Sequence, residues 1–568
     1  MPLPPEVMAR VDRIIAYHDA SKLVPGQTPD PRLADAALRP SPYRIFKGLP
    51  QVVLPTNLLD EAVETLRLMS DGLEVLPQSL INPPHDLKTL ASWLYMAAGL
   101  TCRSQQAGQV HWLRAAPSAG ALYPCEIYVV AFSIDGLEPG LYHFCVKDFS
   151  LYRLRSGHDA LAQIRRGRPD LEILKTMPGL LLVSTRLCRT AWNFGLRSYR
   201  YMAMDAGHQV ESLVLAATGL GIRTMVRLHV NDRTTRELIG IAPDAPFDQL
   251  EPVQAFIAWA EKSPHPLAPP TQWTPPQALE PLARTAPIKG SFDIPQIVKV
   301  HDDCVAPGVG VQEVHPPHTE QSPVDLGSAL SAGATTVEFP SASLSDPSPV
   351  EFESALSPGL SQMQSDSVPS GSALPLPPSL PLRQAMATRR SVRQFTSHSL
   401  SHDQLDTLCH VAFRGGTYYP LFPDGAHMAL VRPFWFIHQV SGLTAGLWYY
   451  NLLEDRLLPV RQGNLRRELA RSLPDPSLGQ TAAAVCFMVA QLKQTMQKTS
   501  PDVYRLAHIE AGMASHRLYL AATSMKLGCC AIGAFYDDEV RQLLGIAQPG
   551  WEVIYGTAIG VPGIIPLP

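Results

Sequence analysis

The sequence contains no apolar run that reaches the roughly 18 residues needed to cross a membrane. Its first residues, from Met1 to Glu6, show no basic segment followed by an apolar one, so no secretory signal is visible. Neither sign of charge dominates, since 47 Lys and Arg face 51 Asp and Glu, and this argues against the basic surface typical of a nucleic-acid binder. We expect a cytoplasmic protein with neither a membrane nor a nucleic acid as its partner.

Cysteine is scarce. Nine residues, an odd number, are spread from Cys102 to Cys530, which indicates reduced thiols rather than a disulfide scaffold. The neighbours Cys529 and Cys530 do not have zinc-ligand spacing, and we expect no metal site. No Walker phosphate loop or Gly-x-Ser-x-Gly turn is present, and Gly219-Leu220-Gly221 has no third glycine for a dinucleotide fingerprint. What remains is a globular composition, with 45% apolar and 17% charged residues.

Proline divides the 568 residues into two folded blocks. Of 54 prolines, 21 lie between Glu261 and Leu380, in a stretch that is also rich in Ser and Ala. Such a segment buries too little apolar surface to offset its ordering entropy, so we interpret residues 263–380 as a mostly disordered linker. An ordered arm packed on the folded blocks is the alternative, and residues 294–300 are its best candidate. Residues 1–262 and 381–568 are then the two domains.

The two blocks repeat each other. One spacing of 305 residues relates Tyr199-Arg200 to Tyr504-Arg505, Asp205-Ala206-Gly207 to Glu510-Ala511-Gly512, and Gly240-Ile241 to Gly545-Ile546. A repeat of this length indicates a duplicated domain. Residues 126–130 and 434–437 have strand-like composition, whereas 205–221 and 510–528 have helical spacing, so each block is expected to be α+β. The small residues in these helices fit either ordinary core packing or a contact between the domains.

Two segments carry residues suited to an aromatic phosphate ligand. Guanidinium and hydroxyl groups match phosphate oxygens, and the second block opens with Arg389, Arg390, Ser391 and Arg393. Small residues let the backbone approach a planar ligand, and the first block has Pro117, Ser118, Ala119 and Gly120 ahead of a strand. Taken singly, each segment also fits an ordinary turn or loop.

Together these segments make the sequence resemble the SagB-type dehydrogenases, the azoline oxidase branch of the FMN-dependent nitroreductase superfamily. The resemblance rests on Pro-Ser-Ala-Gly-Ala-Leu-Tyr-Pro at 117–124, Arg-Arg-Ser-Val-Arg-Gln-Phe at 389–395, Asp-Ala-Gly-His at 205–208, and residues 528–546. It implies two tandem nitroreductase-like α+β domains, joined by the long Pro/Ser-rich linker, that form an intramolecular pseudo-dimer with FMN at the seam. In that family one subunit supplies the phosphate grip and a closing loop, and its partner supplies the Pro-Ser loop.

This sequence divides those parts between its halves. The first block's counterparts of the arginine segment are Asp71, Gly72, Leu73 and Val75, and Asp71 would repel a phosphate. The second block's counterpart of 117–120 falls near 426–429 and has no Pro-Ser. We therefore expect one composite FMN site per chain. The resemblance assigns the phosphate to Arg389, Arg390, Ser391 and Arg393, and the flavin ring to Pro117, Ser118, Ala119, Gly120, Arg114, Ile532 and Gly533.

The catalytic residues stay open. Azoline oxidases that this protein resembles carry a Lys-Tyr pair where this sequence has Asn193 and Phe194, neither of which acts as a base near neutral pH. The leading interpretation is an FMN-dependent oxidoreductase for a peptide-derived or small biosynthetic substrate. The alternatives are a non-catalytic flavin- or peptide-binding scaffold, and a nitro- or quinone-reductase that uses NAD(P)H.

Overall fold

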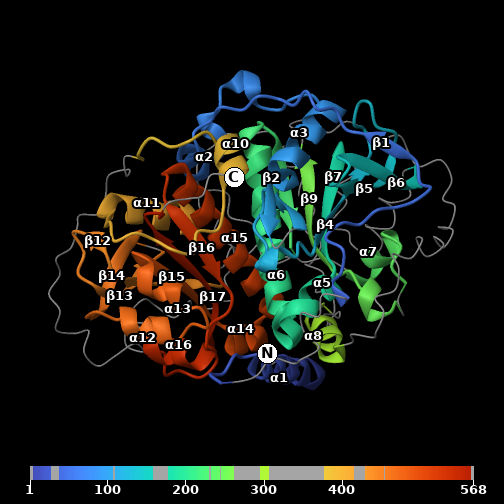
Figure 1. The fold of residues 1–568 in the computed structure, drawn as a ribbon. Coiled ribbons are helices and arrows are strands. Elements are labelled where there is room, and N and C mark those ends of the chain that lie inside the picture. The colour runs from blue at the N-terminus through green and yellow to red at the C-terminus, as the bar shows by residue number, and fades with distance from the viewer. Residues whose placement is uncertain are drawn as a thin grey trace, which may run out of the picture.

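Apolar strands build an antiparallel sheet in each half of the chain (Figure 1). The computed structural model describes residues 4–26, 38–106, 109–157, 177–228, 232–242, 245–260, 294–305, 376–414, 429–452 and 454–563. The first sheet has the order β1-β6-β5-β4-β7-β9-β8 and the second β14-β13-β11-β15-β17-β16. Six strands of the first sheet therefore correspond one by one to the second, as a duplicated domain predicts.

The strands of the first sheet are β1 (Gln51–Val53), β4 (Cys125–Ala131), β5 (Gly140–Cys145), β6 (Ser150–Ser156), β7 (Gly179–Thr185), β8 (Arg223–Arg227) and β9 (Val253–Ala260). Those of the second are β11 (Arg432–Ile437), β13 (Gly446–Asn451), β14 (Arg456–Gln462), β15 (Ala484–Gln491), β16 (Gly528–Ile532) and β17 (Trp551–Gly560). A hairpin of β2 (Leu100–Gln106) and β3 (Gln109–Arg114) and a short pair of β10 (Leu400–Ser401) and β12 (Val440–Ser441) complete the strands. The strands predicted at 126–130 and 434–437 lie within β4 and β11.

Helices cover the sheets. Those of the first half are α1 (Pro5–Ala20), α2 (Thr65–Asp71), α3 (Leu87–Ala98), α5 (Leu187–Phe194), α6 (Ser198–Gly219) and α7 (Asp232–Leu238). Those of the second half are α10 (Leu382–Thr388), α11 (His402–Phe413), α12 (Arg466–Arg471), α13 (Pro476–Thr481), α14 (Leu492–Lys498), α15 (Val503–Ser524) and α16 (Asp537–Leu543). Local signals set some boundaries: Ser401 and Gln404 form a capping box that starts α11.

The long helices α6 and α15 lie side by side between the two sheets (Figure 1). A Cβ atom on Gly207 would lie 2.0 Å from the carbonyl oxygen of Ile509, and one on Gly512 would lie 2.2 Å from that of Met204. Only glycine permits this approach. The small residues therefore form a contact between the domains, and one hydrophobic core extends across both halves.

Helix α8 (Pro295–Val305) lies inside the stretch predicted as linker. It packs on α1, where Arg10 Nε donates to the carbonyl oxygen of Asp303 at 2.8 Å and Arg13 pairs with the Asp303 carboxylate. His301 lies 3.1 Å from the Tyr199 hydroxyl of α6. This part of the linker is thus the ordered arm that the alternative predicted. Residues 263–293 and 306–375 lie outside the described residues.

Three features that composition bears on are seen in the described residues. All nine cysteines are described, and each is a free thiol. Among the described residues, no helix combines the length and apolar character that crossing a membrane requires. Within the same ranges, no three His, Cys, Asp or Glu side chains gather as a metal site would need.

Candidate functional site at the seam between the domains

Three polar side chains on the central helices have apolar counterparts in the 305-residue repeat. Tyr201 and His208 of the first half correspond to Leu506 and Met513, and Tyr519 of the second half corresponds to Val214. The three polar side chains share one seam: the His208 ring centre lies 5.9 Å from that of Tyr519, and both Tyr201 and Tyr519 contact residues 531–533. We call this side of the helix pair the polar seam and its pseudo-symmetric equivalent the apolar seam.

Arg389 crosses the polar seam from the second domain to the first. Its Nε atom donates to the carbonyl oxygen of Ala115 at 2.8 Å, and its Nη2 atom to that of Arg114 at 3.3 Å. The guanidinium lies 5.2 Å from the centre of the Tyr519 ring and is 4% exposed. The arginine segment therefore lies directly against the residues that precede the 117–120 loop, as a composite site requires.

The other two arginines are more accessible than Arg389. Arg390 is half-buried and donates through Nη2 to the carbonyl oxygen of Thr101 on β2 at 3.2 Å. Arg393 is exposed, and its charge acts on the thiol of Cys530 on β16. Arg390 Nη1 also donates to the carbonyl oxygens of Ala387 and Arg389, so of the three guanidinium groups that of exposed Arg393 is the most open to an incoming anion.

Tyr519 holds the arginine segment against β16. Its hydroxyl lies 2.8 Å from Ser391 Oγ and accepts a hydrogen bond from the backbone N–H of Ala531, also at 2.8 Å. The backbone N–H of Val392 donates to the carbonyl oxygen of Cys529. The phosphate-grip segment and the strand that leads to Ile532 and Gly533 are thus fixed to each other.

Asp205 of α6 anchors the 117–120 loop through hydrogen bonds. Ser118 Oγ donates to the Asp205 carboxylate at 2.6 Å, the Ala119 N–H donates to it at 3.0 Å, and Ser118 Oγ accepts from the Tyr123 N–H at 2.9 Å. Gly120 has φ +60° and is exposed. Ser118 therefore supports the loop with its hydroxyl, while the backbone around Ala119 and Gly120 is the part that faces outward.

Arg114 contributes its backbone to the seam rather than its charge. Its guanidinium lies 4.8 Å from the centre of the Tyr123 ring, and Nη2 donates to the carbonyl oxygen of Pro42 at 2.5 Å. The side chain is buried in the first domain, and the Arg114 carbonyl oxygen is the atom that Arg389 contacts. The sequence placed Arg114 near the flavin, and the structure brings only its main chain to Arg389.

Gly533 meets the first domain at two points. A Cβ atom there would lie 2.2 Å from the Tyr201 ring, so glycine is required at this position. Arg197 donates to the Gly533 carbonyl oxygen through Nε at 3.2 Å and Nη2 at 3.1 Å. Ile532, the last residue of β16, is buried. The loop after β16 is therefore held by α6 and the turn before it.

Two stacked rings connect the loops of the two domains. Phe194 and Tyr201 lie with ring centres 4.2 Å apart and planes 25° from parallel. The tip of the Phe194 ring is 3.4 Å from the position of a Cβ atom on Gly120, and Tyr201 touches Gly533. Phe194 and Tyr201 thus form an aromatic wall of the polar seam.

Burial and neighbouring arginines shift the pKa values of the acidic and histidine side chains around the seam. Burial raises the pKa of Asp205 to about 7, and burial together with the Arg389 charge lowers the pKa of His208 to about 3, so this imidazole is neutral at physiological pH. The guanidinium groups of Arg197 and Arg200, at 2.6 and 2.8 Å, hold the pKa of Asp537 far below its ordinary value although burial opposes them. The carboxylates at the seam are therefore engaged in holding loops and helices.

Unpaired buried nitrogens point to space for a polar ligand. The Nδ1 atom of His208 and both ring nitrogens of His516 are buried, and within the described part of the chain they have no hydrogen-bond partner. Buried polar atoms of this kind are normally satisfied by water or a ligand. Together with exposed Arg393, half-buried Arg390 and the exposed backbone at Gly120, they fit a bound group that is polar, partly aromatic and anionic.

The apolar seam retains the hydrogen bond between the carboxylate of a central helix and the loop, but it lacks the arginine segment. Glu510, the counterpart of Asp205, accepts from the backbone N–H of Leu430 at 2.8 Å, so 430 stands where the first domain has 119. Asp71 ends α2, and the counterparts of the arginine segment continue as a short 3₁₀-helix over Gly72–Val75. Residues 426–428 of the predicted counterpart loop lie outside the described residues.

Sequence reasoning missed Tyr519 and Tyr201 as parts of the site. A signal was present, because each is a tyrosine whose repeat partner, Val214 or Leu506, is aliphatic. Residues that diverge between duplicated halves mark the place where the halves have taken different roles.

Comparison with known proteins identifies the class of fold. The sequence profile of the Nitroreductase family matches residues 83–250 and 386–561, one match in each domain. The crystal structure of a putative nitroreductase from Anabaena variabilis superposes with a TM-score of 0.66 at 24% identity, covering 97% of this chain and 99% of that one. Both domains and their arrangement therefore share a known tandem fold.

Two curated proteins are also similar. "Putative nitroreductase MJ1384" of Methanocaldococcus jannaschii is 32% identical over 164 residues, which are 28% of this chain and 77% of that protein. The trifolitoxin-processing protein TfxB of Rhizobium leguminosarum bv. trifolii is 30% identical over 153 residues, or 26% of this chain and 41% of TfxB. The chain belongs to the Nitroreductase family, whose members are flavin-dependent oxidoreductases.

Proposed function

We propose that the protein is a SagB-type dehydrogenase that holds one FMN at the polar seam. The observation that carries the proposal is the contact of Arg389 with the carbonyl oxygens of Arg114 and Ala115. This contact joins the arginine segment of one domain to the Pro-Ser loop of the other. The counterpart positions at the apolar seam begin with Asp71, whose charge disfavours a phosphate.

In this proposal, residues from the two domains bind different parts of FMN. Arg390 and Arg393, with Ser391, hold the FMN phosphate through charge-assisted hydrogen bonds, while Arg389 adds positive charge and joins the domains. The backbone at 117–120 and at 532–533 borders the flavin ring. When bound, FMN supplies hydride transfer, and the protein supplies its binding and orientation. Phe194 and Tyr201 exclude water from the space between the loops.

The substrate class follows from the resemblance and from one relative. SagB-type dehydrogenases act on azoline rings in modified peptides, and TfxB, which matches part of this chain, is a trifolitoxin-processing protein. We infer a peptide-derived or small biosynthetic substrate. Because Phe194 replaces the family's tyrosine, the proton leaves to solvent or to a group on the substrate rather than to a Lys-Tyr pair.

The proposal is tested by the flavin content of variants. Arg390→Ala with Arg393→Ala removes the half-buried and the exposed cation of the arginine segment, and we expect FMN occupancy of the purified protein to fall at least about tenfold, because two charge-assisted contacts are lost. Arg67→Ala is the control, since Arg67 is an exposed arginine on α2. Flavin occupancy unchanged by the double substitution would refute the phosphate assignment.

A second measurement separates the competing activities. Anaerobic addition of NAD(P)H bleaches the flavin of a nitro- or quinone-reductase, whereas a substrate dehydrogenase bleaches only with its own substrate. A folded protein that carries no flavin at all would favour the scaffold. We expect a yellow protein whose flavin is not reduced rapidly by NAD(P)H.

A further inference from the structure

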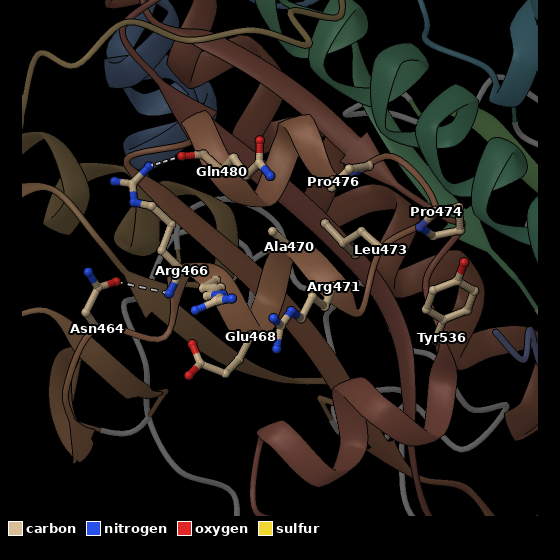
Figure 2. Close-up of a pocket in the computed structure, with 11 residues that line it drawn as sticks. Asn464, Arg466, Glu468, Ala470, Arg471, Leu473, Pro474, Pro476, Gln480 and Tyr536 are labelled. Atoms are coloured by element: carbon tan, nitrogen blue, oxygen red, sulfur yellow. Dashed lines mark hydrogen bonds between the residues drawn. The ribbon is translucent and has the colours of Figure 1, made fainter.

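A pocket of about 790 Å³ lies in the second domain between α12, α13 and Tyr536 (Figure 2). Three arginines of α12, Arg466, Arg467 and Arg471, line it, and Glu468 is the carboxylate that lines it with them. Figure 2 shows Arg466, Glu468 and Arg471 rising from one short helix, and Tyr536 coming from a separate segment. The pocket is therefore a cationic hollow in a chain whose net charge is −4.

The arginines differ in how they are held. Arg466 is half-buried and donates to the carbonyl oxygen of Gln480, and its backbone N–H donates to Asn464 Oδ1 at 3.1 Å. Arg467 and Arg471 are exposed, and among the described residues neither has an ion-pair partner. Two charged forks are thus available to carboxylates, and one fixed arginine forms the wall beside them.

The lining also has an apolar part, formed by Ala470, Leu473, Pro474 and Pro476 together with the ring of Tyr536, and it includes the amides of Asn464 and Gln480. A nucleic acid needs a continuous basic surface, which a chain with this charge balance does not favour. A mixed cationic and apolar hollow instead complements a peptide that carries both acidic and aliphatic side chains.

The pocket lies close to the polar seam. The backbone N–H of Tyr536 donates to the carbonyl oxygen of Ser472 at the end of α12, at 2.9 Å. Tyr536 follows Gly533 by three residues, so their Cα atoms are at most about 11 Å apart. A chain docked in the pocket therefore lies beside the loop that we place at the flavin.

We propose that this pocket binds an acidic segment of a peptide, with its carboxylates on Arg467 and Arg471 and its aliphatic side chains on Leu473 and Tyr536. The binding itself is independent of flavin. The further role as the docking segment of a substrate rests on the proposed function, because it requires that the substrate be a peptide.

The test is a fluorescence anisotropy titration of the full-length chain with a fluorescein-labelled peptide of alternating glutamate and leucine. Arg467→Gln with Arg471→Gln is compared with Arg67→Gln with Lys498→Gln, which changes the net charge equally at exposed positions outside the pocket. We expect the first pair to weaken binding at least about tenfold and the second less than about twofold, because only the first removes charge-assisted contacts. A peptide with glutamine for glutamate is expected to bind at least about tenfold more weakly than the acidic one.

Several outcomes would overturn the inference. They are absence of binding of the acidic peptide, equal binding by the two double variants, equal binding of the glutamine peptide, and displacement of the acidic peptide by a short RNA that binds more tightly. Flavin content measured on the same samples separates the two proposals. A flavin-free chain that binds the peptide refutes the proposed function alone, and a flavin-loaded chain that does not bind it refutes this inference alone.

Discussion

One buried carboxylate controls the loop that we place against the flavin. Asp205 accepts from Ser118 and from the Ala119 N–H, and burial raises its pKa from 3.8 to about 7. The folded state therefore retains a proton that the unfolded state releases. The stabilising contribution is complete below pH 3.8 and is lost as pH rises toward about 7.

Asp205→Asn tests this pH dependence. The amide is a neutral isostere of the protonated acid, so the variant does not lose stability from this group as the pH rises. We expect the unfolding free energy of the wild type to fall relative to that of the variant between pH 5 and pH 7, measured by urea titration at each pH. Parallel pH profiles of the two proteins would contradict the assignment.

The contribution of Asp537 to stability is expected to depend on pH in the opposite direction. Arg197 and Arg200 hold its pKa far below the ordinary value, so its contribution is present above that ordinary value and is lost as pH falls through the folded-state pKa. Asp537→Asn leaves two buried guanidinium groups without their counter-charge, and we expect a loss of about 3–5 kcal/mol in unfolding free energy at neutral pH.

The neighbouring residue is the control for that substitution. Asp538 is 72% exposed and pairs with Lys22 at the surface, so Asp538→Asn is expected to change stability by about 1 kcal/mol or less. Chemical denaturation of both variants measures the two losses in unfolding free energy. Similar losses for the two substitutions would show that Asp537 does not act as a buried counter-ion.

Side-chain roles at the seam were only partly predictable from sequence. The motifs predicted that Arg389, Ser118 and Arg114 lie near one another. From their residue types, we expected these side chains to contact the ligand. In the structure Arg389 binds backbone carbonyls, Ser118 donates to Asp205, and Arg114 reaches Pro42. A hydrogen bond to a distant backbone oxygen depends on the fold, and any residue supplies that oxygen, so the sequence carries no signal for it.

The contact between α6 and α15 depends on two glycines. A methyl group at Gly207 would lie 2.0 Å from the carbonyl oxygen of Ile509, and the helix backbone there cannot move without separating the domains. Helix propensity alone predicts that Gly207→Ala stabilises the protein by about 1 kcal/mol. The clash predicts a destabilisation of more than about 2 kcal/mol.

Whether Gly207→Ala raises or lowers the stability of the protein therefore shows which of the two effects, helix propensity or steric clash, is larger. Thermal unfolding of Gly207→Ala is compared with Gly219→Ala at the end of the same helix, where the nearest obstacle is the flexible side chain of Leu382 at 2.8 Å. We expect a clearly lower midpoint for the first variant and a smaller change for the second. A higher midpoint for Gly207→Ala would show that the helices separate without cost.

The extent of these helices was harder to predict than their existence. Apolar spacing indicated helices from 205 and 510, but α6 begins at Ser198 and α15 at Val503. The missed turns carry buried Arg200 and Arg505, which break the apolar pattern. Arg200 donates to the carbonyl oxygen of Val553 and Arg505 to that of Gln254, each in the other domain. These hydrogen bonds form only when the two domains associate.

Duplication explains why the fold was predictable from the sequence. The common spacing of the two blocks predicted the central helices and an α+β fold in each half, because each side of the repeat supports the other. The loss of the arginine segment in one half and of the Pro-Ser loop in the other indicated a single site. The polar seam and the apolar seam follow the same asymmetry, with Tyr201, His208 and Tyr519 on one side only.

We propose that the two domains together form one flavin site, at the polar seam. The most direct test is the molar ratio of FMN to polypeptide after reconstitution with excess FMN, removal of free flavin, and absorbance of the flavin released by denaturation. We predict one FMN per chain. A ratio of two would show that the apolar seam also binds flavin, and a ratio of zero for the folded protein would show that neither seam does.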